Sequence, residues 1–301
     1  MKNTILIGPS GFLGPAILEK YPSIIAVGRK KPPFYCKNKF IHIKNIYNLK
    51  KLDQLKIDYV IFLIGNSNHH ILNSESLDKA FSYNVYPLAS ALNYFSNRNV
   101  KKIITFSGAL VYDEKKIKIP CKENSKLNGY KNKYIFSKFI AEKITRFYQE
   151  KNRIVNVRLS NIYGPSLLER PDIIISIFNK ILKKKKVQIM SDIPARDFIH
   201  VNDVADGVIK LLKSDFTGNI NLGTGKHTSI KKIIEIITKI TGAKIFSKQA
   251  KVSGPIIYSH DISLLKKHTK WQPKINVSKG MLMTWKKMKH WKKKSNEFKK
   301  K

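Results

Sequence analysis

The hydrophobic pattern changes its period repeatedly along the first half of the chain. Short apolar runs predict buried strands, and longer stretches with apolar residues at every third or fourth position predict helices. The predicted strands span residues 4–7, 24–27, 40–43, 59–64, 102–106 and 154–159, and the main helices span residues 11–20, 77–96 and 133–151. Strands that alternate with helices in this way predict an α/β protein with a doubly wound parallel sheet, which binds ligands at the carboxyl ends of its strands.

The second half of the chain follows this pattern less regularly. Apolar segments at about residues 198–222 are interpreted as returns to the main sheet. The sequence therefore predicts a first domain over residues 1–165 that these returns complete. A smaller C-terminal lobe is expected from residues 166–197 and 223–285, and a basic tail over residues 286–301 follows it.

Three glycines stand where the first predicted strand turns into a helix. Gly8 would permit a tight turn, Gly11 would let a pyrophosphate approach the backbone, and Gly14 would let the helix pack closely on the sheet. The start of that helix, at Phe12 and Leu13, offers free backbone donors and a positive dipole end to an anion. These features indicate a dinucleotide site. The alternative is a purely structural turn, because the glycine spacing is one residue longer than the commonest fingerprint.

Tyr134 and Lys138 are four residues apart in the third predicted helix, so their side chains lie on one helix face. A nearby ammonium, together with the positive ring of an oxidised nicotinamide cofactor, would stabilise tyrosinate and lower the phenol's pKa from its ordinary value of ~10. The tyrosine would then exchange a proton with a sugar hydroxyl or a ketone near neutral pH. The alternative is a buried tyrosine beside a solvated lysine.

The chain is strongly basic, with 58 Lys and Arg against 20 Asp and Glu and a formal net charge of +38. Such a field attracts nucleotides, nucleic acids or anionic lipid surfaces. The excess is mostly scattered Lys, which also fits an AT-rich coding bias, so no specific nucleic-acid partner is expected. The densest runs are residues 183–186 and 286–301. Met and Trp residues before and within the second run predict either a membrane-surface helix or a docked helix with a solvated basic face.

The chain has two cysteines, Cys36 and Cys121, which excludes a disulfide framework and a zinc-type cysteine cluster. A reducing compartment, the cytoplasm, is therefore expected. No apolar run approaches the ~20 residues of a membrane-spanning helix. His69 and His70 have no neighbouring carboxylate or cysteine at a ligand spacing, so we expect them to be solvated and expect no metal site.

Seven further motifs follow the glycine turn in a characteristic order. They are residues 58–65 (DYVIFLIG), 84–85 (NV), 106–112 (FSGALVY), 158–165 (RLSNIYGP), 196–205 (RDFIHVNDVA), 221–225 (NLGTG) and 271–273 (WQP). With the Tyr134 and Lys138 pair, this series resembles the extended short-chain dehydrogenase/reductases, in the NAD-dependent nucleotide-sugar epimerase/dehydratase family. The resemblance covers nearly the whole chain. It implies a Rossmann-like dinucleotide-binding domain with a smaller C-terminal substrate-binding lobe.

The resemblance also implies roles for individual residues. Tyr134 would be the acid/base, Lys138 would bind the nicotinamide ribose and lower the pKa of the tyrosine, and Ser107 would hydrogen-bond the reacting oxygen. Gly65 and Asn84 would line the cofactor site.

Asn161 and Arg196 would lie near the nucleotide-sugar diphosphate, by the same resemblance. A guanidinium suits this place because it can form paired hydrogen bonds with phosphate oxygens. The alternative for Arg196 is an ion pair with Asp197 or Asp203.

The chain departs from the family at its catalytic hydroxyl. The family's Ser or Thr usually stands four residues before the tyrosine that matches Tyr112, and Gly108 holds that position here. The nearest hydroxyl, that of Ser107, stands one residue before this position. Dehydratases of the group carry an Asp-Glu pair just after the hydroxyl residue. Depending on the register, these positions hold Gly108 and Ala109 or Ala109 and Leu110 here, so dehydration is disfavoured.

The choice of cofactor depends on the end of the second strand. NAD-binding sites usually place an acidic residue there, and this chain has Arg29, which could bind a 2′-phosphate. NADP is therefore at least as well supported as NAD, unless Arg29 is solvated or lies beside the adenine. Asn45 stands roughly where the family commonly has an Asp near the adenine.

The resulting interpretation is hydride transfer at C4 of a nucleotide-linked sugar, by a 4-epimerase or a 4-ketoreductase. Two other classes remain open: a catalytically silent dinucleotide-binding sensor or scaffold of the same fold, and a nucleic-acid-binding module, which would bind in a strongly salt-dependent manner. The resemblance also implies a homodimer through the helix near Leu77 and the helix that carries Tyr134.

Overall fold

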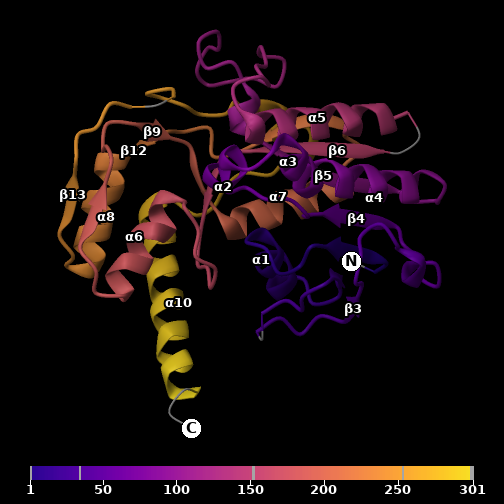
Figure 1. Ribbon diagram of the computed structural model, residues 1–301, viewed down its shortest axis with the longest axis horizontal. Helices are drawn as coiled ribbons and strands as arrows, with labels where there is room; N and C mark the ends of the chain where they lie inside the picture. The colour runs from indigo at the N-terminus through magenta and orange to yellow at the C-terminus, as the bar shows by residue number, and fades with distance from the viewer. Residues whose placement is uncertain (1, 34, 151–152, 253, 299–301) are drawn as a thin grey trace.

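The computed structural model describes residues 2–33, 35–150, 153–252 and 254–298. Its centre is a seven-stranded sheet in the order β11-β6-β5-β4-β1-β2-β3, and every neighbouring pair in it is parallel (Figure 1). The strands are β1 Thr4–Ile7, β2 Ile25–Gly28, β3 Phe40–His42, β4 Tyr59–Phe62, β5 Lys102–Gly108, β6 Ile154–Leu159 and β11 Gly218–Leu222. The predicted doubly wound parallel sheet is confirmed.

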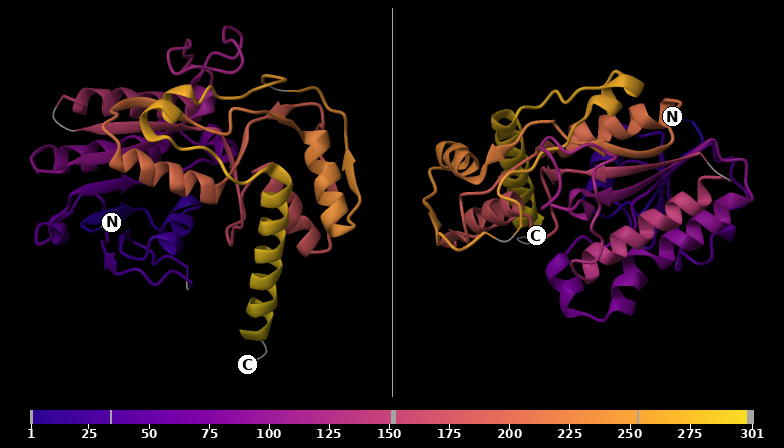
Figure 2. Two further views of the ribbon diagram at one scale, coloured as in Figure 1. Left: turned by 180° about the vertical axis from the view of Figure 1, so that it is seen from behind. Right: turned by 90° about the horizontal axis from the view of Figure 1, so that it is seen from above.

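Helices cover both faces of this sheet, as the view from above in Figure 2 shows. Alternate strand residues point to opposite faces, so Leu6 joins one buried core while Ile5 and Ile7 join the other. The first core is covered by α1 (Leu13–Lys20) and α7 (Val201–Lys213), and the second by α4 (Tyr86–Ser96) and α5 (Lys133–Tyr148). In each case apolar burial against the sheet holds the layer in place.

The sheet order places a topological switch between β1 and β4. After β1 the chain winds outward to β2 and β3, and it then returns to β4 on the other side of β1. Ligands of open α/β sheets bind at the carboxyl ends of the strands at such a switch. Here these ends lead to Gly8 after β1 and to Gly65 beyond β4.

The smaller elements extend the molecule beyond this edge (Figure 1). Three two-stranded sheets pair β10 with β7, β12 with β9 and β13 with β8. The further strands and helices of the second half of the chain are β7 Asn161–Tyr163, α6 Ile173–Leu182, β8 Val187–Ile189, β9 Ala195–Arg196, β10 Phe198–His200, β12 Thr228–Ser229, α8 Ile230–Thr241, β13 Ile245–Ser247, α9 Ser263–Thr269 and α10 Val277–Phe298. The boundaries predicted between the two lobes stay a prediction.

One predicted helix is two helices in the structure. The stretch over residues 77–96 forms α3 (Leu77–Asn84) and α4, which meet at Val85. Pro87 lies in the first turn of α4, where its missing N–H leaves no intrahelical bond unmade, and it favours a new helix start there. Two short 3-10 turns, Lys50–Leu52 and Ala109–Val111, and the helix α2 (His69–Ser74) complete the described elements.

The basic tail belongs to a longer helix. α10 begins at Val277, well before the predicted tail, and residues 299–301 lie outside the described part. Met281, Met288 and Trp291 are buried, and the Trp291 ring stacks on Tyr35 with 5.0 Å between ring centroids. This burial supports the docked helix rather than a free amphipathic one. In the described part of the chain, no helix combines the length and the apolar character that crossing a membrane requires.

Candidate active site

Backbone geometry explains two of the three glycines after β1. Gly8 has a φ of +89°, which side-chain-bearing residues rarely adopt. A Cβ at Gly14 would lie 2.5 Å from the carbonyl oxygen of Pro9, whereas a Cβ at Gly11 would meet only Gly8 O, at 3.8 Å. Gly8 and Gly14 are therefore required by the turn itself. Gly11 has no such steric reason, which is consistent with a backbone left open to a ligand.

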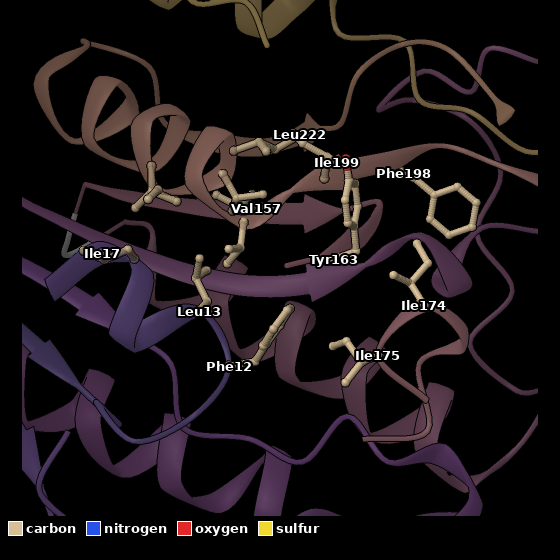
Figure 3. Close-up of a cluster of buried hydrophobic side chains, with 14 of the residues drawn as sticks. Phe12, Leu13, Ile17, Val157, Tyr163, Ile174, Ile175, Phe198, Ile199 and Leu222 are labelled. Carbon is tan, nitrogen blue, oxygen red and sulfur yellow. The ribbon is translucent and has the colours of Figure 1, made fainter. Parts of the chain in front are cut away.

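The start of α1 is free to bind an anion. Its N-cap residue, Phe12, makes no side-chain capping bond, and the first turn carries no acidic residue. Backbone N–H groups at such an end are suited to a pyrophosphate. The side chains of Phe12 and Leu13 point into the core with Val157 and Ile175 (Figure 3), so only their backbone atoms are available to a cofactor.

Three cofactor-site candidates meet beyond β4. A Cβ on Gly65 would lie 3.0 Å from Asn84 Oδ1 and 3.2 Å from Lys138 Nζ, so the missing side chain leaves room beside both polar groups. Asn84 is buried; its Oδ1 accepts from the Asn66 N–H at 2.8 Å, and its Nδ2 donates to Ser137 Oγ at 2.9 Å. These bonds tie the loop after β4 to α3 and α5. A Cβ at position 65 would crowd both polar groups, so glycine is the residue that fits there without displacing them.

Tyr134 and Lys138 occupy successive turns at the start of α5, as the spacing predicts. Burial raises the pKa of Tyr134 to about 12, with Asp172 adding to the rise and Arg170 opposing it. Burial alone lowers the pKa of Lys138 to about 8. In the protein alone, desolvation of tyrosinate is the largest effect on this group. The expected lowering of the phenol's pKa includes the positive ring of a bound oxidised cofactor, so it stays a prediction.

Ser107 lies near the carboxyl end of β5, aligned with Arg158 of β6. Its side chain is only 7% exposed, and its Oγ has no hydrogen-bond partner among the described residues. An unpaired buried hydroxyl is costly, and this one keeps its hydrogen-bonding capacity for a group outside the described residues. At Gly108 a Cβ would meet only Leu159 O, at 3.9 Å. The glycine in the family's usual hydroxyl position is therefore not imposed by crowding.

The two predicted diphosphate residues lie on separate short strands. Asn161 begins β7 with an exposed side chain, and Arg196 ends β9, where its Nη1 donates to the carbonyl oxygens of Ala195 and Ile256. The carboxylates considered as ion-pair partners have other bonds. Asp197 accepts from Thr224, Gly225 and His260, and Asp203 accepts from the backbone of Lys274 and Ile275. The ion-pair alternative for Arg196 is wrong.

Arg29 follows β2 directly, and its side chain is exposed. It thus stands at the same edge of the sheet as the glycine turn. Asn45 lies in the loop after β3, where its Oδ1 accepts from the Tyr47 N–H at 3.0 Å.

His69 was expected to be solvated, and this expectation is wrong. Its ring is half-buried, with its centroid 6.3 Å from that of Tyr134 and 4.1 Å from that of the exposed His70. Burial lowers the pKa of His69, which favours the neutral imidazole. Among the described residues, no group of three or more His, Cys, Asp or Glu could hold a metal ion.

Arg170 is a second residue near the site that the sequence did not single out. Its guanidinium lies 4.6 Å from the Phe12 ring centroid, and it donates to Asp172 Oδ2 at 2.6 Å and to Ser67 Oγ at 3.1 Å. The segment before α6 is thereby held against both the glycine turn and the loop after β4. No spacing in the sequence indicates these contacts, because they join three segments far apart in the chain.

Comparison with known sequences decides the family. The model of the NAD dependent epimerase/dehydratase family matches residues 4–223. The chain belongs to this family. A curated relative, the UDP-glucuronate 4-epimerase of Thermodesulfobacterium geofontis, is 30% identical over 81% of this chain and 76% of its own. The resemblance inferred from the motifs is confirmed.

Solved structures agree with this family fold. The UDP-glucose 4-epimerase of Thermotoga maritima, solved with UDP-glucose, has a TM-score of 0.86 at 19% identity and covers 96% of this chain and 99% of its own. The UDP-glucuronic acid 4-epimerase of Bacillus cereus, in complex with UDP-glucuronic acid and NAD, has a TM-score of 0.82 at 22% identity and covers 97% of this chain and 100% of its own. At these identities the likeness establishes the Rossmann-like fold.

Every site candidate of this epimerase-family chain lies within the matched segment, from Gly8 to Arg196. Arg170 and His69 also lie within it. α10 and the strand β13 lie beyond it.

Proposed function

We propose that this chain is an NAD-dependent 4-epimerase of a nucleotide-linked sugar. The observation that carries the proposal is the convergence of Lys138, Asn84 and Gly65 beyond β4, one helical turn from Tyr134. The unpaired hydroxyl of Ser107 supports it from the neighbouring strand. The UDP-sugar 4-epimerases among the relatives favour epimerisation over other reactions of the family.

The residues present fit a dinucleotide. The uncapped start of α1 would hold the pyrophosphate through the backbone of Gly11, Phe12 and Leu13, and Lys138 and Asn84 would face the nicotinamide ribose. When bound, NAD would supply the hydride acceptor for C4 and a positive ring that favours tyrosinate.

Each catalytic side chain then has one task. Tyr134 takes the proton from the sugar's O4 and later returns one, while Ser107 donates a hydrogen bond to the same oxygen. Lys138 keeps positive charge near the phenol, so that proton transfer is possible despite the high pKa in the protein alone. Asn161 and Arg196 would hold the diphosphate while the keto sugar rotates and presents its other face to the nicotinamide.

A 4-ketoreductase is the second candidate, and Arg29 favours it. A reductase uses an exchangeable NADPH, and the exposed guanidinium after β2 suits a 2′-phosphate. Nucleotide released from the denatured protein distinguishes the two, because an epimerase retains NAD and returns the hydride to its own substrate.

The assembly is proposed to be a homodimer through α3 and α5. Exposed aromatic side chains on this side, Tyr83 of α3 and Phe147 of α5, support an apolar contact.

Tyr134→Phe tests the assignment. The variant keeps the ring but loses the transferable proton, so we expect turnover of UDP-glucuronate and UDP-glucose to fall by roughly 10²-fold to 10⁴-fold while cofactor binding is retained. Coupled assays of C4 epimerisation and nucleotide titration measure the two effects. Tyr130→Phe is the matched control, since Tyr130 is 77% exposed and precedes α5.

Unchanged turnover in Tyr134→Phe would remove the acid/base role. Failure of the wild-type protein to turn over any nucleotide sugar, with dinucleotide binding intact, would favour the silent sensor instead. Binding of neither cofactor would contradict the proposed site as a whole.

A further inference from the structure

Two lysine-rich segments far apart in the sequence meet at one end of the molecule. The Lys292 ammonium of α10 donates to the carbonyl oxygen of Leu182, the last residue of α6. A turn of four exposed lysines, residues 183–186, follows directly; we call it the lysine turn. The exposed Lys289 and Lys293 of α10 therefore add their charge beside this turn.

The lysine turn leads into a small sheet with one exposed face. β8 pairs in parallel with β13, with Gln188 opposite Phe246. Val187 and Ile189 are buried while Gln188 is exposed, so the residues in register with Gln188 point outward. Five of these outward-pointing residues form what we call the β8–β13 face: Lys186, Met190, Lys244, Phe246 and Lys248.

This face combines positive charge with exposed apolar groups. Met190 is 64% exposed and Phe246 is 48% exposed. The nearby acidic groups are engaged: Glu169 pairs with Lys183, and Asp192 accepts hydrogen bonds from Ser247 and Gln249. Figure 1 shows β13 at the outer edge of the molecule, on the opposite side from β3.

We propose that the β8–β13 face and the lysine turn dock on an anionic lipid bilayer. Lysines attract acidic headgroups, and their methylene stems can lie along the interface with the charge in water. Phe246 and Met190 supply the apolar contact that inserts at the headgroup boundary. The enzyme would then act at the membrane surface.

Two details favour a bilayer over a nucleic acid. The Lys186 ammonium lies 5.4 Å from the Phe246 ring centroid and covers one face of the ring, which a stacked base would need. The cations of the lysine turn and the β8–β13 face are all lysines, whereas arginine is the residue that recognises bases through paired hydrogen bonds.

The test distinguishes membrane binding through this face from attraction by the net charge of the whole chain. The full-length protein is co-sedimented with vesicles of phosphatidylcholine, alone or with roughly one lipid in three as phosphatidylglycerol, at low and high salt. The face variant is Lys184→Glu/Lys186→Glu/Lys248→Glu. Its control, Lys44→Glu/Lys50→Glu/Lys56→Glu, removes the same charge on the β3 side, where all three lysines are exposed.

We expect the wild type to bind only the anionic vesicles, and less at high salt. The face variant should lose roughly a hundredfold in vesicle affinity or more, while the control variant stays within a few-fold of the wild type. Phe246→Ser should weaken binding more than Tyr47→Ser, which changes an aromatic residue that is 54% exposed on the control side. Thermal unfolding and sugar turnover check that each variant is folded.

Equal losses in the two triple variants would overturn the proposal, because they would show attraction by net charge alone. Absence of binding of the wild-type protein to anionic vesicles would also overturn the proposal. If the face variant weakens binding of a single-stranded oligonucleotide but not binding of anionic vesicles, the face binds a nucleic acid and not a bilayer.

Discussion

Arg29 stands exposed directly after β2, at the edge where the adenosine ribose of a cofactor would lie in the proposed site. Its guanidinium would pair with the 2′-phosphate of NADPH and has no such partner on NADH. We expect Arg29→Ala to weaken NADPH binding by roughly tenfold or more and to change NADH binding little. Fluorescence titration with both cofactors measures the ratio.

Lys30→Ala is the matched control for this prediction, because Lys30 is the next residue and is also exposed. If Lys30→Ala changes the NADPH-to-NADH ratio as much as Arg29→Ala does, general charge attraction explains the preference. An unchanged ratio in Arg29→Ala would remove the argument for NADP.

Single residues of the site were predictable where a local spacing carries the chemistry. Tyr134 and Lys138 share one helix face, and Gly8 needs a positive φ in a tight turn, so both features are visible in the sequence. His69 and Arg170 were missed as neighbours of the site. Their contacts depend on which loops the tertiary fold brings together, and no period or spacing encodes that.

At the scale of elements, the β1–α1 turn separates a steric role of glycine from a ligand role. Gly14→Ala would drive a Cβ to 2.5 Å from Pro9 O, which forces the backbone to move. We expect it to lower the free energy of unfolding by about 1–3 kcal/mol, as overpacking typically does. Urea denaturation measures the change.

Gly11→Ala is expected to behave differently from Gly14→Ala. Its Cβ would make only an ordinary contact, so stability should stay close to that of the wild type. The added methyl group would instead stand where a pyrophosphate must approach the backbone, and cofactor affinity should fall. Equal stability loss in both variants, with unchanged cofactor affinity in Gly11→Ala, would make the turn purely structural.

Element types were more predictable than element ends. β1 and β6 match their predicted ranges because apolar runs bounded by polar residues are unambiguous. The break at Val85 was missed because the apolar periodicity continues through it, although Pro87 is visible. The start of α10 was also missed, although Met281 and the other apolar residues before the lysine run were noted, because the predicted tail was bounded by its charge.

At the scale of the whole molecule, alternation predicted the central sheet but not the three small ones. β9 pairs with β12, and β8 with β13, across long stretches of chain. Such pairs depend on short segments with weak patterns, so only the folded structure reveals them. The β8–β13 face is one consequence, because neither strand alone indicates it.

Buried imidazoles link the stability of the whole molecule to pH. His260 lies between the rings of Tyr112 and Tyr258, and burial lowers its pKa to about 3. In the unfolded chain the same group titrates near ~6.5. Between these values the unfolded state binds a proton that the folded state does not, so the free energy of unfolding falls as the pH drops below 6.5. His200, with its pKa lowered to about 4, acts in the same direction.

From this difference we expect His260 alone to lower the free energy of unfolding by about 2 kcal/mol when the pH falls from 7 to 5. His260→Phe removes the titrating group while keeping a ring between the two tyrosines, so its loss of stability over this range should be smaller by that amount, whatever its stability at pH 7. Urea denaturation at both pH values gives the two slopes. A His260→Phe variant that loses as much stability as the wild type would show that this imidazole takes up a proton in the folded protein as readily as in the unfolded chain, and would contradict the lowering of its pKa by burial.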